Sequence, residues 1–169
     1  MDSIKDKEIT TQNSNTPIYY LCERFFIPEN KNYRALNKLQ VDEIVSVDVG
    51  LFPESERTIL DKDSAYNHTL QTNEQILCVL LIDDSKEFDA DEISGFEFCG
   101  FDLAEFSTSA ITNCGNYFED TINYKDLNRV GLISDRSSAR RIQSNILANH
   151  PSEAHADCEL YVIWRRVCE

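Results

Sequence analysis

Glycine is scarce in this chain, and the glycine-rich motifs of nucleotide-binding proteins are missing. Only five glycines occur in 169 residues, and neither the phosphate-binding pattern GxxxxGKS/T nor the dinucleotide-binding pattern GxGxxG is present. The metalloprotease pattern HExxH and the hydrolase pattern GxSxG are missing as well. These absences argue against a nucleotide-dependent enzyme and against a serine hydrolase.

Long apolar runs are lacking too. No window approaches eighteen apolar residues, and the N-terminal sequence MDSIKDKEITTQ has no apolar stretch of the kind found in secretory signals. The six cysteines show no CxxC spacing, and several lie in apolar surroundings, so we expect buried free thiols, with Cys99 and Cys114 in the core. We therefore expect a cytoplasmic protein that uses no cofactor.

Basic residues are outnumbered by acidic ones. Sixteen Lys and Arg residues stand against thirty Asp and Glu residues, for a formal net charge of -14. The excess lies in the first three quarters of the chain, because residues 129–169 hold six arginines and five acids. Such a charge disfavours binding to nucleic acid or to an anionic membrane, and it favours a basic partner.

Short apolar segments with strand-like patterns make up most of the rest of the chain. Strands are predicted at residues 18–27, 43–51, 76–82, 96–103, 107–113 and 159–167, with at most one more near 58–60 in the otherwise irregular segment 53–74. The run ILCVLLI at 76–82 is typical of a strand covered on both faces, so we place it in the middle of the sheet. In the last strand, Leu160, Val162 and Trp164 share one face.

A change of apolar phase marks the strand at 96–103. Phe96 and Phe98 are in phase with each other, whereas Phe101 and Leu103 have the opposite phase, and Gly100 stands between the two pairs. A glycine at such a position predicts a β-bulge, which inserts one residue and restores the buried face. The three phenylalanines and Leu103 are then expected to build the core.

One clear helix is predicted at about 135–149. Ser134 or Asp135 can cap its N-terminus, and Pro151 follows its end. The apolar positions with helical spacing are Ala139, Ile142, Ile146 and Leu147, and three arginines are expected on the solvent side: Arg136, Arg140 and Arg141. The sequence thus predicts a flexible polar leader (1–16) and a single α+β domain (17–169), with a mostly antiparallel sheet of about five to six strands and this helix packed on one face.

Acidic residues are concentrated after the central strand and continue along the next predicted strand. They are Asp83, Asp84, Glu87, Asp89, Asp91, Glu92, Glu97, Asp102 and Glu105. Carboxylates at this density attract a basic partner over long range, so we expect them to form a partner-binding surface. The alternative is a solvated loop and strand edge without a binding role.

Two catalytic alternatives are weaker. Cys114 lies at a predicted strand end and His155 precedes the last strand, which allows a thiol-dependent enzyme, although no third residue is marked to orient the base. A metal site would have to draw on His150, His155, Asp157 and Cys158, and the second ligand pair of a typical zinc site is missing. We therefore expect neither a metal ion nor enzymatic activity.

Four segments of the C-terminal half resemble small bacterial proteins encoded at polymorphic-toxin and contact-dependent growth inhibition loci. The segments are GFEFCGFDLAE, SAITNCG, LNRVGLISD and HADCELYVIWR, within about residues 95–165. The resemblance implies an immunity protein that binds one cognate toxin domain, often a basic nuclease, and blocks its active site. Two alternatives stay open: the thiol-dependent enzyme using Cys114 and His155, and an acidic DNA mimic or adaptor.

Overall fold

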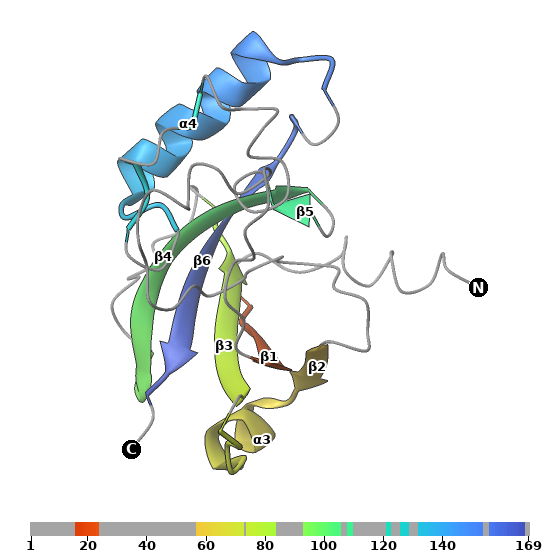
Figure 1. Ribbon diagram of the computed structural model, residues 1–169, viewed down its shortest axis with the longest axis vertical. Coiled ribbons are helices and arrows are strands. Elements are labelled where there is room, and N and C mark those ends of the chain that lie inside the picture. The colour runs from red at the N-terminus through yellow and green to blue at the C-terminus, as the bar shows by residue number, and fades with distance from the viewer. Residues whose placement is uncertain are drawn as a thin grey trace, which may run out of the picture.

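The computed structural model describes residues 16–23, 57–72, 74–83, 93–105, 108–109, 121–122, 126–128, 132–153 and 156–167 (Figure 1). In these residues a six-stranded antiparallel sheet has the strand order β2-β1-β3-β6-β4-β5. The elements are β1 (Ile18–Glu23), β2 (Arg57–Leu60), α3 (Lys62–Asn67), β3 (Glu74–Leu81), β4 (Phe96–Glu105), β5 (Thr108–Ser109), α4 (Arg136–Asn149) and β6 (Glu159–Arg166). The predicted α+β fold, with an antiparallel sheet and one main helix, is confirmed.

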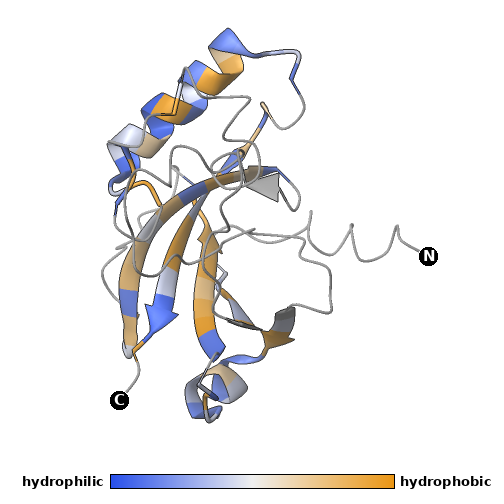
Figure 2. Cartoon of the chain, in the orientation of Figure 1, coloured by the Kyte–Doolittle hydropathy of each residue, from blue (hydrophilic) through white to orange (hydrophobic). Residues whose placement is uncertain are grey.

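Strand β3 lies inside the sheet, between β1 and β6, as its apolar run predicts. Ile76, Cys78 and Leu80 belong to the core cluster on the side of α4, whereas Leu77 and Val79 belong to a second cluster on the opposite face. Both faces of the strand are therefore buried. Figure 2 shows the mostly apolar colouring of β3 and the alternation of apolar and polar residues along α4.

Helix α4 packs on the sheet through a narrow apolar stripe. Ala139, Ile142 and Ile146 have no exposed surface and join the cluster that contains Trp164 of β6. Burying a side chain as large as isoleucine contributes roughly 1.5–3 kcal/mol. Leu147, which the pattern assigns to this stripe, is 48% exposed, so that part of the prediction is wrong.

The predicted bulge in β4 is present. The pairing of β4 with β6 shifts between Phe98 and Gly100, and Gly100 has a φ of 145°, a conformation that other residues rarely adopt. A Cβ at Gly100 would lie 2.7 Å from the Cβ of Leu132 and 2.9 Å from the carbonyl oxygen of Ile133. Glycine therefore serves both the bulge and the close approach of residues 132–133.

The bulge restores the apolar face only in part. Phe96, Phe101 and Leu103 all belong to the core cluster under α4, as expected. Phe98 packs its ring against Phe101 with a centroid separation of 5.5 Å, but its side chain remains 38% exposed. The expectation that all three phenylalanines are core residues is thus wrong for Phe98. Cys99 is buried on the opposite face, whereas Cys114 lies outside the described residues.

Helix α3 is an element that the sequence did not predict, because its segment reads as loop. Asp61 caps it by accepting a hydrogen bond of 2.7 Å from the Ser64 amide. At the other end Arg166 donates hydrogen bonds to the carbonyl oxygens of Ala65 (2.8 Å) and His68 (2.7 Å). A helix of six residues is marginal by itself, so these contacts with the last strand fix it.

Several other predictions fall on residues outside the described ranges. They concern the leader at 1–15, the strand at 43–51, the end of the first strand after 23, and most of the strand at 107–113. Among the helices that the structure describes, none is long and apolar enough to cross a membrane.

Candidate binding cleft and acidic residues

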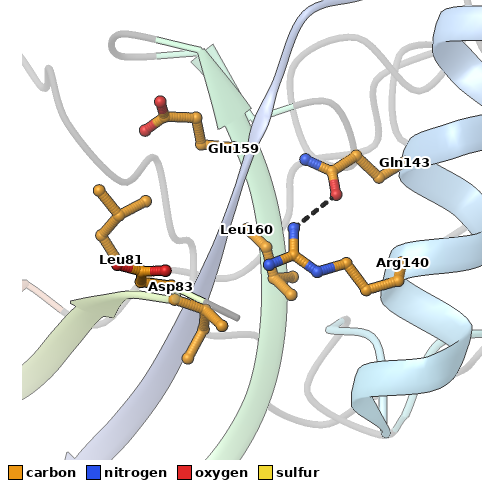
Figure 3. A pocket seen from close by; sticks show the side chains of 7 residues that line it. Leu81, Asp83, Arg140, Gln143, Glu159 and Leu160 are labelled. Carbon is orange, nitrogen blue, oxygen red and sulfur yellow. Dashed lines mark hydrogen bonds between the residues drawn. The ribbon is translucent and has the colours of Figure 1, made fainter. Parts of the chain in front are cut away.

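A cleft of about 380 Å³ opens where β3 ends and β6 begins, beside α4. Its lining residues are Leu81, Ile82, Asp83, Arg140, Gln143, Glu159 and Leu160 (Figure 3). Because β3 and β6 are antiparallel neighbours, the last residues of one strand lie beside the first residues of the other. The Ile82 amide donates a 3.0 Å hydrogen bond to the Leu160 carbonyl oxygen, which fixes this end of the sheet.

The strand side of the cleft combines an apolar floor with two carboxylates. Ile82 and Leu160 are buried and Leu81 is partly buried. Asp83, the residue after Ile82, is half-buried, whereas Glu159, the first residue of β6, is exposed. Ile82 and Leu160 belong to the core cluster on the side of α4, whereas Leu81 packs against the cluster on the opposite face, so the lining comes from both faces of the sheet.

The helix side of the cleft is polar. The Arg140 Nη1 donates a hydrogen bond of 2.7 Å to the Gln143 Oε1, and the Gln143 Nε2 donates one of 2.6 Å to the Cys158 carbonyl oxygen. Figure 3 shows both side chains reaching from α4 toward the strands. These bonds tie the guanidinium group to the wall formed by the helix and the start of β6.

Arg140 does not lie on the solvent side of α4, where the sequence analysis places it. It is only partly exposed and lines the cleft. Positions 140 and 143 flank the buried stripe of Ala139, Ile142 and Ile146, and a long side chain at such a flank can extend across the edge of the sheet. A polar pair with i, i+3 spacing beside the stripe is the signal in the sequence that marks this wall.

Tyr161 lies next to Glu159 on β6 and stays protonated. Burial raises the pKa of the Tyr161 hydroxyl well above its usual value of 10, and the negative charge of Glu159 raises the pKa further. Tyr161 also forms a side-chain hydrogen bond with Glu159. The carboxylate at the start of β6 therefore has a neutral hydroxyl beside it at neutral pH.

The structure places the predicted acidic residues in different environments. Asp83 lines the cleft and Glu105 is half-buried at the end of β4. Glu97 is exposed and forms an ion pair with Arg165, with a distance of 2.7 Å between its Oε1 and the Arg165 Nη2. The others lie outside the described residues: Asp84, Glu87, Asp89, Asp91 and Glu92.

Asp102 does not belong to any acidic surface, contrary to the prediction. Its side chain has no exposed area, and its Oδ1 accepts a hydrogen bond of 2.8 Å from the Leu103 amide. Asp102 alternates with Phe101 and Leu103 along β4 and pairs with Tyr161 of β6. Because the sheet is buried on both faces here, the position that alternates with core residues is itself inside the protein.

Two of the buried thiols, those of Cys78 and Cys158, are poor nucleophiles. Cys78, Cys99 and Cys158 are free and buried. Burial raises the pKa of Cys78 and that of Cys158 to about 12, so neither forms a thiolate at neutral pH. Cys114 and His155, the residues of the thiol-enzyme alternative, lie outside the described part of the chain.

Metal ligation has no geometric support in the same part of the chain. Among the described residues, no three His, Cys, Asp or Glu side chains come together in a way that could hold a metal ion. His150 follows α4 and Cys158 is buried before β6, whereas His155 is outside the described ranges.

No protein-family model, curated protein or solved structure matches this chain.

Proposed function

We propose that this chain is a cytoplasmic immunity protein that binds a basic toxin domain, such as a nuclease, and neutralises it without catalysing a reaction. The observation that carries the proposal is the acidic segment 83–92, with six carboxylates and a single lysine in ten residues, in a chain of net charge -14. The segment starts at the end of β3, an inner strand of the sheet, and its first residue lines the cleft.

The charge of this segment would act mainly on the rate of encounter. Negative potential concentrated on one region steers a basic partner and raises association rates by roughly 10- to 1,000-fold at low salt. The sheet would hold the first residue of the segment in place, because the preceding residue, Ile82, is fixed by its hydrogen bond to the Leu160 carbonyl oxygen. Specificity would then come from close contacts made after the encounter.

The test is affinity capture from the source organism with two matched variants. One variant replaces Asp84, Asp89 and Asp91 with Asn. The control replaces exposed acids outside the segment with the corresponding amides, at Asp63, Glu153 and Asp157, and so loses the same charge. We expect a basic protein to be captured by wild type and control and to be lost from the segment variant.

The proposal also requires that the captured protein be toxic and that the chain inhibit it. Co-expression should rescue growth with wild type and control, and the segment variant should rescue it less. Equal capture and equal rescue by both variants would exclude the acidic segment as the binding surface. Competition by duplex DNA for the same site on the partner would instead favour a DNA mimic.

A further inference from the structure

We propose that Tyr66, Phe96 and Phe98 form an aromatic patch on which an arginine side chain of the partner stacks after the encounter. The inference rests on the proposed function, since it takes the partner to be basic, but the patch can be tested without the partner. Two of the three rings are partly exposed, that of Tyr66 by 37% and that of Phe98 by 38%. Aromatic side chains at the surface are enriched where proteins bind one another.

Several contacts hold the Tyr66 side chain in place. Its ring packs edge-on against the rings of Phe96 and Tyr19, with centroid separations of 5.4 Å and 6.2 Å. The hydroxyl groups of Tyr66 and Tyr19 share a hydrogen bond, so the polar end of Tyr66 is directed toward a core residue. Burial raises the pKa of the Tyr66 hydroxyl above its usual value of 10, so it stays neutral at physiological pH. A ring held in this way loses little conformational entropy when a partner covers it.

Phe98 extends the patch along β4. Phe96 and Phe98 are two residues apart on this strand, so they lie on the same face of the sheet with about 7 Å between their Cα atoms. Phe101 supports the Phe98 ring from the side of α4, at a centroid separation of 5.5 Å. The patch therefore runs from α3 onto the first half of β4, and Figure 1 shows both at the same end of the sheet.

The patch lies where the acidic segment 83–92 rejoins the sheet. Ile93 follows the segment directly, and its carbonyl oxygen accepts a hydrogen bond of 3.1 Å from the Phe96 amide. A partner residue attracted by the segment would therefore arrive within a few residues of the three rings. Arginine is the basic residue suited to both contacts, because its planar guanidinium stacks on aromatic rings and also pairs with carboxylates.

The test is an NMR titration of the full chain, ¹³C-labelled at its aromatic residues, with two peptides of equal charge, hexa-arginine and hexa-lysine. Salt at about 150 mM suppresses diffuse attraction to the acidic chain. The two peptides differ in the planar group that stacks on a ring, which only arginine has. We expect hexa-arginine to bind more tightly and to cause saturable shifts of the Tyr66 and Phe98 ring signals that exceed those caused by hexa-lysine.

Substitutions within the patch should remove this preference. Tyr66→Leu and Phe98→Leu should each weaken hexa-arginine binding about two- to fivefold, because each removes one stacking contact at an exposed site. Tyr66→Phe loses the hydroxyl but keeps the ring, so it should retain the preference for arginine. The control Leu147→Ala shortens an exposed apolar side chain of α4 outside the patch and should leave binding unchanged. The NMR spectra report directly that each variant is folded.

Three outcomes would overturn the proposal. They are equal affinities and equal ring shifts with the two peptides, shifts without saturation, and unchanged hexa-arginine binding in both leucine variants. Each of these results would leave the proposed function standing, because the affinity-capture experiment changes Asp84, Asp89 and Asp91 and leaves the rings intact. If the chain instead captured no toxic basic protein but preferred hexa-arginine, the proposed function would fail and the patch would remain an arginine-binding surface.

Discussion

Arg165 of β6 and Glu97 of β4 form an ion pair across neighbouring strands, with the Arg165 Nε and Nη2 3.0 Å and 2.7 Å from the Glu97 Oε1. The Arg165 side chain is 16% exposed and that of Glu97 is 50% exposed. The charge of Glu97 is thus largely compensated by its neighbour. Glu97 is consequently a weaker candidate for partner binding than the acidic segment 83–92, which holds six carboxylates and one lysine.

Replacing Glu97 with Gln should have small effects. An exposed ion pair contributes about 0–1 kcal/mol, so the free energy of unfolding measured by urea denaturation should fall by no more than that. The association rate with the partner should change less than for Asp84→Asn, which removes the same charge. A larger decrease in association rate for Glu97→Gln than for Asp84→Asn would indicate that Glu97 belongs to the binding surface.

Gly100→Ala should be strongly destabilising. The added Cβ would meet Leu132 at 2.7 Å and the Ile133 carbonyl oxygen at 2.9 Å, and φ is 145°. Strain and overpacking together should lower the free energy of unfolding by about 2–4 kcal/mol, measured by urea denaturation.

The matched control for this substitution is Gly95→Ala. Gly95 also has a positive φ, 82°, but the nearest atom to an added Cβ is the Tyr66 Cε1 at 3.7 Å. Only the conformational penalty remains, and about 1–2 kcal/mol is expected. If both substitutions lowered the free energy of unfolding equally, residues 132–133 would not pack on the bulge as tightly as the structure shows.

The cap of α4 makes part of the stability dependent on pH. Hydrogen bonds from the Ser138 amide and then from its hydroxyl lower the pKa of Asp135 below its usual value of 3.8. Because the pKa is lower in the folded state, the stabilisation is fully present above about pH 4 to 5 and is lost as pH falls through the folded pKa. Asp135→Ala should cost about 1 kcal/mol at neutral pH.

Asp135→Asn is the matched variant for this effect. Asparagine also caps helices well but does not titrate, so most of the neutral-pH stability should remain while the acid-dependent part disappears. Urea denaturation at pH 7 and at pH 3 measures both. An unchanged acid dependence in Asp135→Asn would show that other carboxyl groups determine it.

Thiol labelling distinguishes the binding protein from the thiol-enzyme alternative. Because burial raises the pKa of Cys78 and Cys158 to about 12, both should resist iodoacetamide at pH 8 in the native protein and react after unfolding. Cys114→Ala should leave biological activity intact. The thiol-enzyme alternative would be supported by two results together. Cys114 would be modified rapidly, and activity would be lost both in the labelled protein and in Cys114→Ala.

The sequence predicts those elements whose signal is local. The run at 76–82 identifies an inner strand because seven consecutive apolar residues need cover on both faces. Gly100 marks the bulge because the apolar residues before it and after it have opposite phases along the strand. Asp135, which caps α4, is likewise one of the two cap candidates that the position before the apolar stripe indicates. Each of these features depends on residues close to one another in the chain.

The remaining features depend on long-range packing and leave no local pattern. Helix α3 is held by Arg166, about one hundred residues later, so its own segment reads as loop. Asp102 is buried on β4, where it pairs with Tyr161 of β6. A charged residue in the sequence gives no sign of such burial. The cleft combines Asp83, Arg140 and Glu159, and only the pairing of β3 with β6 under α4 brings them together.

The most direct test of the central claim is the association rate of the captured partner, measured by stopped flow from low to physiological salt. Wild type and the Asp63, Glu153 and Asp157 control should associate fast and slow down steeply with salt. The Asp84, Asp89 and Asp91 variant should associate at least about tenfold more slowly at low salt, with a shallower salt dependence. Identical rates and salt dependences for the two triple variants would contradict the proposal that the acidic segment guides a basic partner to this protein.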